Sequence, residues 1–302
     1  MRPQAAATAA LVVLLLCVPL AGCYGPPAGP TFTTVQDGKG FNVSIRTPVE
    51  RVVSLVPSHT EIMFAIGAGQ KVVGGTDYDN FPAEAANVSD VLVNLQVNME
   101  KLVSLNPDVV LVSSLNAEAD INKMRDLNLS VFFADAMAVS DVAPMIVLIG
   151  RAVGEVSNAT TVAAQLSVRL NLTQAVIANT TTKPRTFYLL DDYGAWWTSG
   201  RETRGDDLIR YAGGTNIFSN ATGWTAISLE AVSAKNPEVI IVGLYVQLTQ
   251  ETMNTTEPWK SMSAVADGHV YRVPDADLVD RPGPRLSEGL DWMARAIHPE
   301  AY

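Results

Sequence analysis

Cysteine and histidine are scarce in this chain. Its 302 residues include two cysteines, at 17 and 23, and three histidines, at 59, 269 and 298. Cys17 lies inside an apolar N-terminal run that reads as a removable signal, so a processed chain keeps one cysteine and no internal disulfide. A metal site built from histidines needs three or four converging ligands, and this spacing does not indicate one. We therefore expect no metal site and no cofactor, and a fold that depends on its hydrophobic core.

Motifs of the common enzyme classes are also missing. The sequence contains no G-x-S-x-G, no H-E-x-x-H, no phosphate-binding loop and no dinucleotide fingerprint. Lys and Arg form no run, and the formal net charge is −10, which argues against a nucleic-acid partner. Ser58 beside His59 is the one nucleophile–base pair that a secreted α/β enzyme could use. We expect no catalytic residue and no enzyme activity.

The N-terminus resembles that of an exported lipoprotein. Arg2 supplies a positive charge, residues 5–16 form an apolar run too short to span a bilayer, and Leu-Ala-Gly-Cys at 20–23 resembles a lipobox. We predict a signal peptide over 1–22, lipidation at Cys23, and a tether and lead-in over 23–48, which is rich in Pro, Gly and Thr at its start. An ordinary secretory signal with a chance cysteine is the alternative. The predicted location is the outer face of the cell membrane.

Half of the sixteen asparagines stand in Asn-x-Ser/Thr acceptor motifs. These are Asn42, Asn87, Asn128, Asn158, Asn171, Asn179, Asn220 and Asn254. This excess favours a glycosylated, exported surface. Together with a lipobox it indicates an archaeal cell surface, while a composition simply rich in Asn, Ser and Thr is the alternative.

Two stretches 130 positions apart repeat one pattern. Residues 98–112 and 228–242 each begin with a capping residue, Asn98 or Ser228, followed two positions later by Glu100 or Glu230. A short amphipathic helix, an Asn-Pro stop and an apolar β-branched strand come next. A duplicated helix–strand unit indicates two similar lobes with one cleft between them.

The remaining pattern fits this division. Strand and helix signals alternate over 49–140 and again over 183–302, which ends in a closing helix, and this alternation is typical of an open parallel sheet. Between them, residues 141–182 show apolar positions at helical spacing without strand signals, so we expect one long bridging helix, with a kink possible near Gly150 or Gly154. The fold class is α/β, with mostly parallel sheets in two lobes.

Aromatic and cationic residues in the expected loops carry the binding signal. Two adjacent tryptophans cannot both enter one core, so at least one should face a ligand. His59 follows the first strand of the sheet, where ligands of open α/β sheets bind, although local capping is its alternative role. The candidate ligand-binding residues are Tyr78, Trp196, Trp197, Trp224, Arg281 and His59.

Several segments together resemble the class III substrate-binding proteins of ABC importers, the cobalamin- and iron-siderophore-binding family. They are Arg-Val-Val-Ser-Leu-Val-Pro-Ser-His-Thr-Glu at 51–61, the two Glu-bearing units, Trp-Thr-Ser-Gly at 197–200 and Arg-Pro-Gly-Pro-Arg at 281–285. The resemblance implies two Rossmann-like lobes joined by a single long α-helix, with the ligand cleft between them. It also implies that Glu100 and Glu230 dock into arginine pockets of the membrane permease. Without the resemblance, each Glu could simply complement its helix dipole.

Within that family the cobalamin-binding branch is the most similar, because Tyr78, Trp197, Trp224 and Arg281 match pocket residues there. Asp275, Asp277 and Asp280 compete as the acidic partner of Arg281. The resemblance implies a monomeric lipoprotein that delivers a corrinoid to an ABC permease. A ferric siderophore is the alternative ligand, and so is haem, with Tyr78, Tyr193 or His59 on the iron. An adhesive surface lipoprotein is the alternative outside transport.

Overall fold

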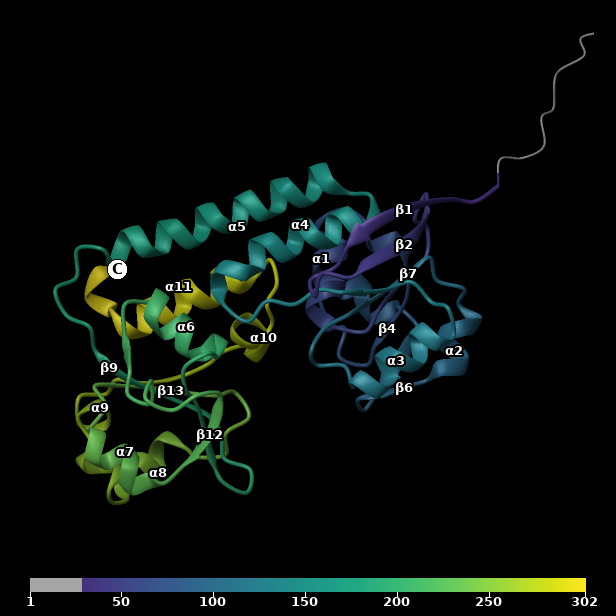
Figure 1. The fold of residues 1–302 in the computed structure, drawn as a ribbon. Coiled ribbons are helices and arrows are strands. Elements are labelled where there is room, and N and C mark those ends of the chain that lie inside the picture. Colours follow the sequence, from purple (N-terminus) through teal and green to yellow (C-terminus); the bar gives the residue numbers. More distant parts are fainter. Residues whose placement is uncertain (1–28) are drawn as a thin grey trace, which may run out of the picture.

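A computed structural model describes residues 29–302 (Figure 1). The predicted signal peptide and Cys23 lie outside these residues. The described chain begins with an antiparallel hairpin of β1 (Thr31–Gln36) and β2 (Asn42–Thr47). Ile45 of β2 is buried in the main core, so residues 31–47 of the predicted tether and lead-in form a hairpin that is attached to the first lobe through β2.

The first lobe is built on one mostly parallel sheet with the strand order β6-β5-β4-β3-β7-β8. Only the pair of β5 and β6 is antiparallel. The strands are β3 (Val52–Ser54), β4 (Val72–Thr76), β5 (Asp90–Val93), β6 (Gln96–Val97), β7 (Val109–Val112) and β8 (Val131–Phe133). The helices are α1 (Pro57–Ala65), α2 (Met99–Ser104) and α3 (Glu118–Asp126), with 3₁₀ turns at η1 (Gly69–Lys71) and η2 (Ala83–Asn87).

The second lobe has a mixed sheet with the order β12-β10-β9-β13-β14, and β11 pairs with the start of β9. Its strands are β9 (Arg185–Asp191), β10 (Trp196–Ser199), β11 (Thr215–Asn216), β12 (Trp224–Ile227), β13 (Val239–Val242) and β14 (Val270–Arg272). Its helices are α6 (Arg204–Tyr211), α7 (Leu229–Lys235), α8 (Gln250–Thr255), α9 (Ser263–Ala266), α10 (Ala276–Asp280) and the closing α11 (Leu286–Ile297). Further 3₁₀ turns are η4 (Trp259–Ser261) and η5 (Pro299–Ala301).

One long helix, α5 (Val156–Ile177), links the lobes, as Figure 1 shows. The segment 141–182 is nevertheless not one continuous helix. After η3 (Val139–Asp141) it forms α4 (Val142–Val153), which ends at Gly154 with φ +79°, and α5 then runs back along it. The two helices touch closely because Gly150 has no side chain: a Cβ there would lie 2.2 Å from that of Ala159. The expected kink is therefore a full reversal of direction.

The predicted repeat is present in both lobes. The side chain of Asn98 accepts a hydrogen bond from the Lys101 amide at 2.9 Å, and that of Ser228 accepts one from the Ala231 amide at 3.2 Å, so both caps form. After each helix the chain turns at an asparagine in the left-handed region, Asn106 or Asn236. The following strands, β7 and β13, are fully buried, as the apolar runs predict.

The largest core connects the two lobes through their helices. It joins Ile62 of α1 to Ile146 of α4, Leu166 of α5 and Leu290 of α11 in one buried cluster. Two smaller clusters cover the other faces of the sheets. Burial continuous across α4, α5 and α11 limits how far the lobes can separate. Among residues 29–302, no helix is both long enough and apolar enough to serve as a membrane span.

Candidate functional site

A cavity of about 360 Å³ opens between the lobes. The first lobe contributes residues that follow the carboxyl ends of β3, β7 and β8, which is where open α/β sheets place their ligands. The second lobe contributes the end of β9, the start of α6, the start of β12 and the loop before α11. The lining residues are Val56, Ser58, His59, Ser113, Ser114, Leu115, Asp135, Met137, Leu190, Thr203, Arg204, Trp224, Asp280 and Pro282.

Two of the six predicted ligand-binding residues line this cavity, and they come from opposite lobes. His59 belongs to α1 and is almost fully buried, and Trp224 opens β12 with half of its surface exposed. A third, Tyr78, lines a smaller hollow of about 60 Å³, and Leu115 borders both this hollow and the cavity. Of the three, His59 and Trp224 lie in the cavity between the lobes, whereas Tyr78 lies in a hollow lined by first-lobe residues alone.

The two adjacent tryptophans lie in strand β10 rather than in a loop, and Trp224 also lies in a strand. Strand residues alternate between faces, so Trp196 and Trp197 point in opposite directions. Trp196 stacks on Trp259 at 4.8 Å between ring centroids and packs against the second core. Trp197 pairs with Ala226 of β12, which puts it on the same face as Trp224. Trp196 is thus a packing residue, and Trp197 and Trp224 form one exposed aromatic surface.

Arg281 does not line the cavity, because its side chain is engaged in a contact between the lobes. Its Nη1 donates to Glu61 Oε1 at 2.9 Å and to Asn80 Oδ1 at 2.8 Å, and its Nη2 donates to the Tyr78 carbonyl at 2.9 Å. Asp277 of the preceding helix α10 lies 3.0 Å from the Nε of Arg281. Protein groups therefore occupy four of the five N–H donors of Arg281, which speaks against the predicted direct ligand contact.

Glu61 is the centre of this contact. Besides Arg281, it accepts hydrogen bonds from Arg285 Nε at 3.0 Å and from Arg285 Nη2 at 2.7 Å. The Glu61 side chain is 2% exposed, and those of the two arginines are 13% and 12% exposed. We call the group Glu61, Asn80, Asp277, Arg281 and Arg285 the interlobe clasp. It ties α1 and the loop after β4 to the loop before α11.

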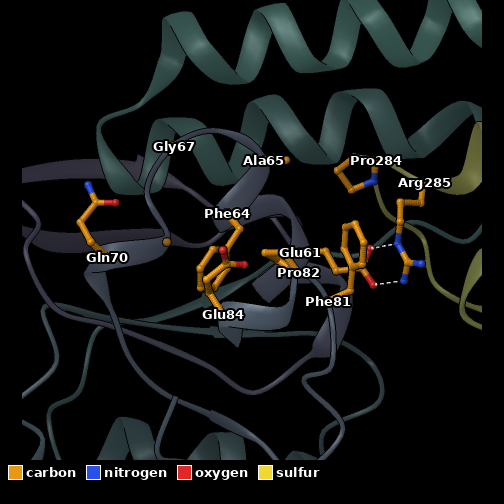
Figure 2. A pocket seen from close by; sticks show the side chains of 11 residues that line it. Glu61, Phe64, Ala65, Gly67, Gln70, Phe81, Pro82, Glu84, Pro284 and Arg285 are labelled. Atoms are coloured by element: carbon orange, nitrogen blue, oxygen red, sulfur yellow. Dashed lines mark hydrogen bonds and ion pairs between the residues drawn. The ribbon is translucent and has the colours of Figure 1, made fainter. Parts of the chain in front are cut away.

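A second cavity, of about 510 Å³, lies behind the clasp (Figure 2). It is lined by Phe64, Phe81 and the clasp pair Glu61 and Arg285, and the Arg285 guanidinium lies 4.0 Å from the Phe81 ring centroid. It shares no lining residue with the cavity between the lobes. Within residues 29–302, none of the buried polar side-chain atoms that lack a partner belongs to a residue lining this cavity. Three of the five unpartnered atoms of the described chain belong instead to residues that line the interlobe cavity, so we take that cavity as the candidate site.

The interlobe cavity, in contrast, has side chains with unused hydrogen-bonding atoms. These are Ser58 Oγ, His59 Nδ1 and Arg204 Nε. Burial lowers the pKa of His59 to about 4, although the Asp135 charge and a hydrogen bond with the Ala134 backbone oppose the shift. The imidazole is therefore neutral near pH 7. Burial also lowers the pKa of Arg204, against the charges of Asp280 and Asp135, but the guanidinium keeps its proton.

Among the three aspartates that competed as the acidic group of the cleft, only Asp280 lines the cavity. Asp275 pairs with Arg285 and Asp277 belongs to the clasp. Displacement of water by the surrounding protein raises the pKa of Asp280 to about 6, and the Asp277 charge adds to this while Arg204 opposes it. Asp280 is thus mostly ionised at neutral pH.

Arg204 and Asp135 line the cavity although the sequence analysis did not name them, and it named Ser58 only as a nucleophile for the alternative enzyme function. Asp135 follows the buried strand β8, and the rule that ligands bind beyond strand carboxyl ends could have identified it. Ser58 stands beside His59 and shares its position at the start of α1. No motif in the sequence around Arg204 identifies it as a site residue, because its position depends on a contact with Ala136 of the first lobe.

Glu100 and Glu230 occupy equivalent positions in the repeat. Each is exposed and is the second residue of its helix, α2 or α7. The two helices belong to different lobes (Figure 1), so each lobe presents one carboxylate to solvent. Within the described chain, no cluster of three or more His, Cys, Asp or Glu side chains is placed to hold a metal ion.

Comparisons with known proteins agree with this geometry. Residues 52–276 match the family model described as periplasmic binding protein. An uncharacterized ABC transporter substrate-binding lipoprotein of Bacillus subtilis is 33% identical, over 100% of this chain and 99% of the relative. The solved periplasmic vitamin B12 binding protein of Vibrio cholerae is similar with a TM-score of 0.72 and 25% identity, over 83% of this chain and 98% of that one. A periplasmic haem-binding protein from a Roseiflexus species, at 23% identity and TM-score 0.73 over 84% of this chain and 100% of that one, shows the shared fold alone.

Proposed function

Because the chain belongs to the periplasmic binding protein family, we propose that it captures a corrinoid between its lobes and delivers it to the permease of an ABC importer. The observation that carries the proposal is the interlobe cavity, with Trp224 on one lobe and His59 on the other. The exposed aromatic side chains of Trp197 and Trp224, on one face of the sheet, suit a large planar ring system. The hollow beside Tyr78 borders this cavity at Leu115.

A corrinoid fits these walls better than haem does. Haem iron takes a His, Tyr, Cys or Met side chain as its axial ligand, and the sequence analysis named only Tyr and His candidates. Tyr193 is 89% exposed and lines no part of the cavity, and Tyr78 lines only the small hollow beside it. His59 lines the cavity, but its free Nδ1 is buried below the surface. Among the described residues, no Tyr side chain lines the interlobe cavity and its one His is almost fully buried, which favours a corrinoid over haem.

Delivery uses the exposed carboxylates of the two lobes. Glu100 and Glu230 stand at helix starts whose caps fix the backbone, so both charges are held at a set separation. Two such carboxylates suit two-point electrostatic docking to cationic pockets. The function involves no bond chemistry: the protein binds, presents the loaded cleft and releases the ligand. Lipidation of Cys23 would hold the protein at the outer face of the membrane, beside the permease.

The docking role is tested by the double variant Glu100→Arg with Glu230→Arg. We expect uptake of the ligand in cells to fall at least tenfold while ligand affinity in titrations stays within twofold of wild type. The matched control is Glu118→Arg with Glu251→Arg, which changes one exposed acid in the first turn of a helix on each lobe. Uptake retained by the first variant, or lost equally in the control, would contradict the proposed docking.

A further inference from the structure

The eight asparagines of the Asn-x-Ser/Thr motifs are all exposed and have little part in holding the fold. The two buried asparagines of the described chain, Asn116 and Asn216, lie outside the motifs. Side-chain nitrogens that donate hydrogen bonds also belong mainly to asparagines outside the motifs, namely Asn80, Asn116, Asn216 and Asn236. Within residues 29–302, Asn158 is the one motif asparagine whose Nδ2 donates, to the Ile66 carbonyl at 3.1 Å and to Glu155 Oε2 at 3.3 Å. A composition merely rich in asparagine gives no reason for this division.

The hydroxyl group at the third motif position divides the eight motifs into two sets of four. In one set this hydroxyl donates to a backbone carbonyl, and the residues are Ser130, Thr160, Thr173 and Thr256. Thr173 is also buried, with 5% of its surface exposed. In the other set the third residue is exposed, and within the described chain neither its hydroxyl nor the side-chain amide of its asparagine forms a hydrogen bond. We call these four the open motifs, and they begin at Asn42, Asn87, Asn179 and Asn220.

Attachment of a sugar to such a motif uses both groups. Nδ2 forms the new bond, and the requirement for Ser or Thr at the third position indicates that the transferase contacts the hydroxyl. With a lipid-linked sugar phosphate as donor, a bond forms between Nδ2 and the anomeric carbon, and the bond from that carbon to the phosphate oxygen breaks. The phosphate keeps the electron pair, and the amide nitrogen gives up one proton. A folded motif whose Nδ2 or hydroxyl is already bonded must first lose that contact, which makes it a poorer acceptor.

The open motifs lie apart from the surfaces that the proposed function uses. No residue of these four motifs lines the interlobe cavity or the hollow beside Tyr78. None belongs to α2 or α7, the helices that carry Glu100 and Glu230. Asn179 follows the end of α5 that lies farthest from the first lobe (Figure 1). Sugars attached at the open motifs therefore start outside the cleft and outside the docking helices.

We propose that the open motifs are N-glycosylation sites, modified on the folded chain at the outer face of the membrane by a transferase that uses a lipid-linked sugar phosphate. The modified residues are Asn42, Asn87, Asn179 and Asn220. The other four motifs stay unmodified, because the fold engages their hydroxyl and, in Asn158, also the Nδ2 atom. The inference does not depend on the identity of the ligand, since it concerns the outer surface alone.

Mass spectrometry of peptides from the protein, purified from the membranes of the cells that naturally produce it, tests the assignment. Peptides with the four open motifs should carry sugar, and those with Asn128, Asn158 and Asn254 should not. Trypsin leaves Asn171 and Asn179 in one peptide, residues 170–185, so electron-transfer fragmentation has to place the sugar on Asn179. Sugar on none of the open motifs, or on the other four as often as on the open ones, would overturn the inference.

Variants of the hydroxyl residue test one site directly. Thr181 is exposed and its hydroxyl has no partner in the described chain, so neither Thr181→Ala nor Thr181→Ser should change the Tm. Thr181→Ala should remove the sugar from Asn179, and Thr181→Ser should keep it. The matched control, Thr160→Ala in the Asn158 motif, should leave the sugar content of the intact protein unchanged. Sugar that stays on Asn179 in Thr181→Ala, or sugar content that falls in Thr160→Ala, would overturn the assignment.

Discussion

Replacing Glu61 with glutamine should weaken the attachment of the two lobes to each other. The carboxylate is buried, with 2% of its side chain exposed, and it receives three hydrogen bonds from Arg281 and Arg285. Removing one partner of a buried ion pair costs about 3–5 kcal/mol. Glutamine keeps the size and can accept one of the bonds, and Asp277 still faces Arg281, so we expect the lower end, about 3 kcal/mol.

Thermal unfolding followed by calorimetry measures this cost. For a domain of this size, each kcal/mol shifts the Tm by roughly 2–4 °C, which predicts a decrease of roughly 6–12 °C for Glu61→Gln. The matched control is Glu155→Gln. Glu155 forms an ion pair with Lys71 at 2.8 Å, but its side chain is 26% exposed, so its loss should cost no more than about 1 kcal/mol.

Hydrogen exchange locates the effect. Glu61→Gln should raise amide exchange in the loop around Asn80 and in residues 281–285, the segments that the clasp connects, with little change in β7 or β13. A Tm decrease equal to that of Glu155→Gln, or exchange that rises uniformly over both lobes, would refute the reasoning that Glu61 ties the lobes together.

Two further predictions concern the cleft. Trp224→Ala should weaken ligand binding at least tenfold with little loss of stability, because the side chain is half exposed. Trp196→Ala should lower the unfolding free energy by about 3 kcal/mol, because it removes the stack on Trp259. Titration and thermal unfolding of both variants check this, and the opposite pattern would contradict the assignment of Trp224 to the ligand and Trp196 to the core. Burial lowers the pKa of His59 to about 4 in the folded protein. As the pH falls, the imidazole is therefore protonated in the unfolded chain before it is protonated in the folded one. The stability that neutral His59 contributes is fully present above pH 6.5 and is lost between pH 6.5 and 4. The difference in unfolding free energy between wild type and His59→Asn should therefore change by about 3 kcal/mol over that range in denaturant titrations, and a difference that does not vary with pH would contradict the buried, neutral imidazole.

The sequence was sufficient where the fold depends on local signals. Capping residues, Asn-Pro stops and β-branched runs are read within a few positions of the chain, so the duplicated unit with Glu100 and Glu230 was predicted with the correct caps and strands. The lobes and the long helix between them followed from the alternation of strand and helix signals. The reversal at Gly154 is also local, but a glycine in a helical pattern is compatible with either a kink or a turn.

The site was harder to predict because its contacts are long-range. Arg281 looked like a free cation in a rigid loop, yet its partner Glu61 is 220 positions away, and only the folded chain shows that the charge is neutralised. Trp196 and Trp197 were assigned to a loop, although alternation in a strand explains better why one is packed and the other exposed. Arg204 is held at the cavity by a hydrogen bond to the carbonyl of Ala136 in the other lobe, which local sequence does not reveal.

The most direct test of the account is a calorimetric titration of the purified protein with cyanocobalamin, dicyanocobinamide, haem and a ferric hydroxamate. The account predicts saturable binding of one corrinoid per chain, with weaker or no binding of haem and the ferric chelate, and a loss of at least tenfold in corrinoid affinity in Trp224→Ala. Binding of haem or the ferric chelate without any binding of corrinoids would contradict the proposed function.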